Sequence, residues 1–155
     1  MGIRARIFLL IFLSLSISIT ISYIIAERDL TKTFEEQILD QLEKQASLLV
    51  EYIDEVDSLL INNNADSIAD RLGNASNSRV TLILNNGKVI GDSYIDEKEL
   101  SQLDDHSTRE EFIEALKYGF GWSSRYSASV KQQQLYFAVR DNNEVSPNII
   151  RIAVP

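Results

Sequence analysis

The chain has 155 residues, a net charge of −8 and no cysteine. Its length allows one domain with its own core beyond an apolar N-terminal run, and argues against two. The lack of cysteine excludes disulfides, thiolate catalysis and cysteine-based metal sites, and the acidic balance argues against nucleic acid or an anionic lipid surface as a partner. His106 is the only histidine, which severely constrains a zinc site or a Ser-His-Asp triad.

Residues 7–26 carry no charge and are rich in Ile, Leu and Phe. Roughly 20 such residues span the hydrocarbon core of a bilayer as a helix, so this run predicts a transmembrane anchor. Arg4 and Arg6 precede it, so residues 1–6 are expected in the cytoplasm and the rest outside the cytoplasmic membrane, in a single-pass topology. A cleaved signal peptide is the alternative, but its apolar core is usually about 7–15 residues and ends at a small-residue cleavage site.

Residues 27–61 are expected to form one long extracytoplasmic stalk helix. Apolar residues recur there at steps of three and four, which is a helical spacing: Leu30, Phe34, Ile38, Leu42, Ala46, Leu49, Ile53, Val56 and Leu60. This stripe could pack only on its own domain. We expect part of it also to contact a second copy in a homodimer, because the helix is longer than the small domain behind it.

The first half of the remaining domain, residues 62–155, predicts a short helix and a β-hairpin. Asn62–Asn64 interrupts the helical pattern, Asn64 or Asp66 is a candidate N-cap, and Gly73 is the expected helix end. Residues 80–84 and 89–90 then read as two strands, because the periodicity changes to two. The Asn86-Gly87 pair between them favours a type I′ turn.

The second half predicts a helix followed by three strands. After an acidic connection over residues 92–105, Thr108 and Glu111 have the spacing of a capping box for a helix that ends near Gly119. Strands are expected near residues 122–127, 135–140 and 148–154, with their aromatic residues in the core: Trp122, Tyr126, Tyr136 and Phe137. The fold class is therefore α+β, a PAS-like or single-Cache-like five-stranded antiparallel sheet with flanking helices.

Five short segments resemble, in the same order, motifs of membrane sensor histidine kinases, most closely those of the phosphate-regulon sensor kinase (PhoR) group. They are Arg79–Leu84 with Asn86–Ser93, Asp105–Leu116, Gly119–Ser127, Leu135–Val139, and Arg151–Pro155. Asp105 departs from the family pattern, which has Asn there.

The resemblance implies that the chain is the signal-input region of a two-component receptor. Its full-length parent would be an ATP-dependent protein-histidine kinase that phosphorylates a response regulator, with a second transmembrane helix and the kinase part beyond Pro155. ATP and Mg²⁺ are implied only for that part; no catalytic residue, metal site or cofactor is predicted here. A chemoreceptor input domain and a single-pass membrane scaffold are the alternative functions.

Arg109, Arg125 and Tyr126 are the candidate ligand-binding residues. The guanidinium fork of Arg suits carboxylate or phosphate, and in a PAS-like fold the helix and third strand flank the pocket. A small anion or a partner protein outside the membrane would then be the stimulus. Alternatively, the arginines, with Arg79, pair with nearby acidic residues such as Asp92, Asp104 or Asp105. His106 is expected to be an ordinary capping or packing residue of a loop, with pH sensing or metal binding as the alternative.

Overall fold

The computed structural model describes residues 2–55, 58–128, 130–141 and 147–155, and for residues 58–63 the backbone alone. The chain forms two units, Met1–Asp40 and Gln41–Pro155. The first lies within helix α1 (Ile3–Glu55). The second holds the end of α1, helix α2 (Ser58–Ser76) and the sheet with its flanking elements.

Helix α1 contains one stretch that is long and apolar enough to cross a membrane, with a mean hydropathy of 2.4 in its most apolar window. Within that stretch, the hydroxyls of Ser14 and Thr20 donate to backbone carbonyls three and four residues earlier, both at 2.9 Å. Bonds of this kind would satisfy the hydroxyl groups inside a membrane, where water is absent. Helix α1 ends at Glu55, six residues before the predicted end of the stalk helix.

The apolar stripe of α1 divides into two parts. Its later members are buried in the second unit: Leu42, Ala46, Leu49 and Ile53. Leu30 and Phe34 are more than half exposed. Val56 and Leu60 lie outside the described side chains. The later part of the stripe therefore belongs to the core of the chain's own domain, and the homodimer contact stays a prediction.

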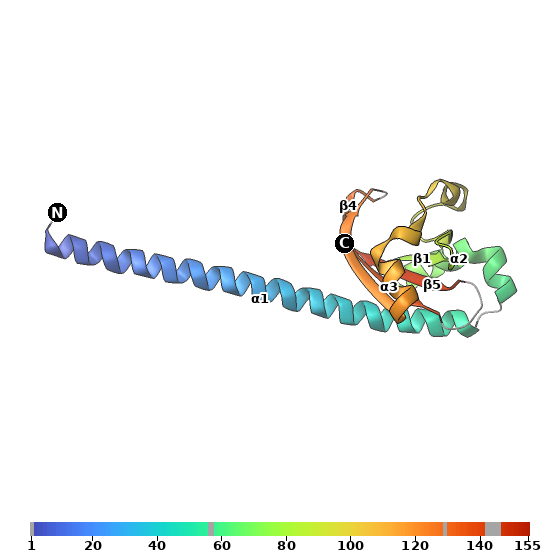
Figure 1. The fold of residues 1–155 in the computed structure, drawn as a ribbon, viewed down its shortest axis with the longest axis horizontal. Helices are drawn as coiled ribbons and strands as arrows, with labels where there is room; N and C mark the ends of the chain where they lie inside the picture. The colour runs from blue at the N-terminus through green and yellow to red at the C-terminus, as the bar shows by residue number, and fades with distance from the viewer. Residues whose placement is uncertain (1, 56–57, 129, 142–146) are drawn as a thin grey trace. The chain divides into compact units, whose positions relative to one another are not determined.

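The sheet consists of β1 (Arg79–Ile83), β2 (Val89–Asp92), β3 (Phe120–Ser127), β4 (Gln132–Arg140) and β5 (Ile149–Val154). The strand order is β2-β1-β5-β4-β3, and every neighbouring pair is antiparallel. Two short 3-10 helices, η1 (Glu97–Gln102) and η2 (His106–Thr108), lead into helix α3 (Glu110–Tyr118). The predicted α+β fold class, a five-stranded antiparallel sheet with flanking helices, is confirmed (Figure 1).

Helices α2 and α3 cover opposite faces of the sheet, as two glycines show. A Cβ at Gly121 in β3 would lie 2.6 Å from the carbonyl oxygen of Glu111 in α3. A Cβ at Gly91 in β2 would lie 2.5 Å from the carbonyl oxygen of Ala65 in α2. Gly121 pairs with Ala138 and Gly91 pairs with Leu82, which places the two glycines on different faces. Both contacts require a residue without a side chain.

The C-terminal end of helix α2 differs from the prediction. Helix α2 runs through Gly73 to Ser76, and the left-handed residue that follows is Asn77 (φ 50°). Asn tolerates this conformation and replaces the expected glycine; Gly73 instead lies where a Cβ would be 2.4 Å from the side chain of Ser93. The predicted interruption at Asn62–Asn64 is confirmed: Asn64 has non-helical backbone angles (φ −138°, ψ 25°), and α2 consists of two helical parts that meet in a kink there.

The predicted type of the hairpin turn and the predicted capping box are also wrong. The β1–β2 loop has three residues closed by Leu84 and Lys88, and Gly87 is left-handed (φ 83°) while Asn86 is not. This is a type I turn followed by a left-handed residue, rather than type I′. Helix α3 has Arg109 as its N-cap without a side-chain cap bond. Glu111 turns away from the helix start to bind Arg125, so no capping box forms.

Edge position decides which aromatic residues are buried. Tyr136 and Phe137 lie in β4, inside the sheet, and are 3% exposed. Trp122 and Tyr126 lie in the edge strand β3, on the face away from α3, and are 45% and 63% exposed. The prediction that all four belong to the core is therefore wrong for the two residues of the edge strand.

Candidate ligand-binding cavity

One face of the sheet changes from apolar to charged along its length. On the α3 side, Ile83 of β1 and Ile149 of β5 are paired and belong to the hydrophobic core beneath α3. Two residues further along the same face, Thr81 is opposite Arg151, and next Arg79 follows in β1. Side chains alternate across a strand, so this face carries buried cations directly beside the core.

A cavity of about 460 Å³ lies at this charged end of the sheet. Its floor comes from β1, β4 and β5, and its walls come from the end of β3, the segment after η1, and η2 with the N-cap of α3. The lining residues used below are Arg79, His106, Arg109, Arg125, Tyr126 and Arg151, together with Asp104 and Tyr136. The cavity is thus lined by all three candidate residues, Arg109, Arg125 and Tyr126, whose role as ligand contacts stays a prediction.

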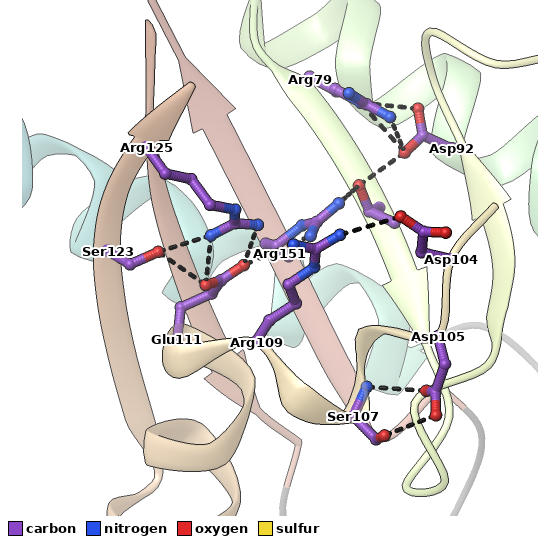
Figure 2. A network of polar contacts seen from close by, with 11 residues as sticks. Arg79, Asp92, Asp104, Asp105, Ser107, Arg109, Glu111, Ser123, Arg125 and Arg151 are labelled. Carbon is purple, nitrogen blue, oxygen red and sulfur yellow. Dashed lines mark hydrogen bonds and ion pairs between the residues drawn. The ribbon is translucent and has the colours of Figure 1, made fainter. Parts of the chain in front are cut away.

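Glu111 of α3 is the centre of the polar contacts under this cavity (Figure 2). Its carboxylate accepts two bonds from the Arg125 guanidinium, at 2.6 and 2.8 Å, and one from Ser123 at 2.7 Å. Arg151 donates to it at 3.4 Å. Burial alone would raise the pKa of Glu111, but bonds from Arg125 and Ser123 and the charge of Arg151 outweigh burial and lower that pKa to about 2.

A second buried pair lies at the other end of the same face. Arg79 of β1 donates to both carboxylate oxygens of Asp92 in β2, at 2.9 to 3.1 Å, and Asp92 also accepts from Thr81 at 2.8 Å. Arg151 donates to the Thr81 hydroxyl at 3.1 Å, so Thr81 joins the two clusters. The polar network therefore extends from β2 across the sheet to β3.

Arg125 is held on two sides. Its guanidinium lies 3.8 Å from the ring centroid of Tyr136, in addition to its two bonds to Glu111. This pairing supports the alternative reading, in which the arginines pair with acidic residues, although the partner is Glu111 rather than one of the expected aspartates. Tyr126 lines the cavity from the exposed edge strand.

Arg109 and His106 are bound more loosely. Arg109 is 3.5 Å from Asp104, whose side chain is 88% exposed. His106 is 7% exposed, so it is buried, which agrees with the expected role as a packing residue. Burial, and then the positive charges of Arg151 and Arg109, lower the pKa of His106 to about 3. The imidazole is therefore neutral at pH 7.

Four of the five motifs behind the kinase resemblance contribute charged residues to this network and cavity: Arg79 and Asp92 from the first, Arg109 and Glu111 from the second, Arg125 from the third and Arg151 from the last. The fourth supplies Tyr136, beneath Arg125. Sequence reasoning gave no role to Arg151 and gave Glu111 only a role in capping the helix. The available signal was a charged residue between apolar neighbours in a strand, as in Ile150–Arg151–Ile152.

The comparisons agree with this architecture. Residues 32–149 match the family model for single Cache-like domains, and no curated protein sequence matches the chain. Solved structures of the ligand-binding domain of the Campylobacter jejuni chemoreceptor Tlp3 are similar in fold, one with 4-methylisoleucine (20% identity, TM-score 0.61) and one with isoleucine (22%, 0.61). Each alignment covers 77% of this chain and 52% or 53% of the Tlp3 chain, so the chain spans about half of that domain. The family match covers most of the chain, which therefore belongs to the single Cache-like family of sensory domains.

Proposed function

We propose that this chain is the extracytoplasmic input region of a membrane receptor and that its arginine-lined cavity binds a small anion. The observation that carries the proposal is the charge balance of the cavity. Four arginines line it, while the two buried carboxylates of the network, Asp92 and Glu111, lie behind them. A bound oxyanion would supply negative charge where the protein supplies too little.

The same balance argues against an amino acid as the ligand. Isoleucine and its analogues, which occupy the Tlp3 domain, carry an ammonium group that needs an acceptor. Asp104 is the only acidic residue in the described lining of the cavity, and it is largely solvated. We therefore expect small carboxylates or phosphate to bind in preference to isoleucine or valine.

The full chain in lipid nanodiscs is suited to the test, with succinate, inorganic phosphate and isoleucine as probes. Isothermal titration calorimetry is expected to detect at least one of the two anions and to find isoleucine bound at least tenfold more weakly. Binding of isoleucine alone, or of none of the three probes, would contradict the small-anion function. Arg140→Gln, outside the cavity and exposed, is the control for nonspecific loss of charge.

The receptor's output has two candidates. The five motifs support a sensor histidine kinase, in which the bound state would be relayed through α1 to an autophosphorylating domain that acts on a response regulator. The structural similarity to Tlp3 supports a chemoreceptor equally well. Sequencing the gene past Pro155 decides between them: a helical phospho-accepting histidine motif with an ATP-binding domain selects the kinase, and a long cytoplasmic methyl-accepting coiled coil selects the chemoreceptor.

A further inference from the structure

Three buried nitrogen atoms around the cavity lack a partner. Among the described residues, Nδ1 of His106 and the Nε atoms of Arg109 and Arg151 make no hydrogen bond. All three residues line the same cavity. An unsatisfied buried polar group costs about 1–3 kcal/mol, and native proteins leave few of them. Three around one cavity indicate that a bound group supplies the missing acceptors.

Both Arg151 and His106 are buried, and Arg151 is also held by hydrogen bonds at two points. Arg151 is 2% exposed and His106 is 7% exposed. The terminal nitrogens of Arg151 each donate one hydrogen bond, one to Glu111 and one to Thr81, whereas its Nε–H donates none. A donor on a side chain already held at two points is preorganised, so little conformational entropy is lost when it binds.

The guanidinium of Arg125 is already bound by Glu111 and Ser123. Both of its terminal nitrogens bond to Glu111, and one of them also bonds to Ser123. A ligand that took this fork would leave the buried carboxylate of Glu111 without its main partner, which is costly. The anchoring groups are therefore expected elsewhere in the cavity than at Arg125 and Tyr126.

We propose that Arg151 and His106 are the residues that recognise the anion, with Arg109 as a third donor from the α3 side. This inference rests on the proposed function and reassigns its recognition groups. The two Nε–H groups of the arginines donate to the oxygens of the anion. With its proton on Nδ1, the neutral imidazole of His106 donates one directional hydrogen bond without charge, so it distinguishes anions by shape and hydrogen-bonding pattern.

Conservative substitutions in the full chain separate recognition from folding. Arg151→Lys keeps a cation beside Glu111 but removes Nε–H. His106→Leu removes the hydrogen bond, whereas His106→Asn places an amide atom near the position of Nδ1. Arg125→Lys tests the competing assignment, and Arg140→Lys is the control outside the cavity.

Affinities for succinate and inorganic phosphate are measured by calorimetry in nanodiscs. Losing a charge-assisted bond typically costs about 1.5–3 kcal/mol, so Arg151→Lys is expected to weaken the better-bound anion roughly ten- to hundredfold. His106→Leu is expected to weaken it about tenfold, and His106→Asn to restore most of that loss. Arg125→Lys is expected to change affinity less than about threefold while lowering the melting temperature without anion.

A failure of the small-anion function and a failure of the residue assignment give different results. If wild type binds neither anion, the small-anion function falls. If wild type binds an anion and Arg151→Lys and His106→Leu bind it as well as wild type does, the function stands and this assignment is overturned. A large loss confined to Arg125→Lys would also overturn it, because recognition would then belong to the edge strand.

Discussion

The charge of Glu111 is expected to be a main source of the sheet domain's stability, and Glu111→Gln tests it directly. The substitution keeps the shape of the side chain and removes its charge. The carboxylate is fully buried, and it faces Arg125, Arg151 and Ser123 within 3.4 Å. Removing one partner of a buried ion pair typically costs about 3–5 kcal/mol, because the other charge stays buried without compensation.

The pKa of Glu111 gives an independent magnitude. It lies at about 2 in the folded chain against 4.5 for an ordinary Glu, and one pKa unit corresponds to about 1.36 kcal/mol, so the charged form contributes about 3 kcal/mol at pH 7. The folded-state pKa is depressed, so this contribution is complete above pH 4.5. It declines as the pH falls toward 2, and roughly half of it is left at pH 3.

Urea unfolding of the full chain in detergent micelles, followed by the fluorescence of Trp122, measures both values. Glu111→Gln is expected to be about 3 kcal/mol less stable than wild type at pH 7, with roughly half of that difference left at pH 3. Glu110→Gln removes the same charge from the exposed neighbouring position and is the control. A difference below about 1 kcal/mol at pH 7, or one that does not change between the two pH values, would refute the reasoning.

Three further outcomes are expected. Gly87→Ala should destabilise the domain more than Gly119→Ala in thermal melts. Both glycines are left-handed (φ 83° and 93°). A Cβ at Gly87 would lie 2.4 Å from atoms of the loop before α3, whereas a Cβ at Gly119 would have nothing within 4 Å. Equal losses would mean that only the backbone conformation matters, at about 1–2 kcal/mol each. Single cysteines in membranes should cross-link between copies at exposed Phe34 and not at buried Ala46; equally low yields at both would favour a monomer. Protease added to spheroplasts should digest residues 27–155, and their full protection would reverse the predicted orientation.

Local sequence signals determined the elements of this protein. An uncharged apolar run, a helical stripe, alternating strands and an Asn-Gly pair each depend on residues within one or two turns or strands, so they could be interpreted without the fold. The five-stranded antiparallel sheet and its flanking helices follow from that order of elements. Where local rules were wrong, a contact from elsewhere in the chain had changed the outcome: Glu111 is drawn from its capping position to Arg125, and Gly73 packs closely against Ser93 instead of ending a helix.

The composition of the cavity was decided only by the tertiary structure. Side-chain chemistry and the expected fold named Arg109, Arg125 and Tyr126, but which charges face one another depends on strand order and register. β5 lies between β1 and β4, and this central position places Arg151 opposite Thr81 and near Glu111, which is 40 residues earlier in the chain. These neighbours cannot be read from the linear sequence. Their pairing determines which arginine is bound to a carboxylate and which still has a donor available for a ligand.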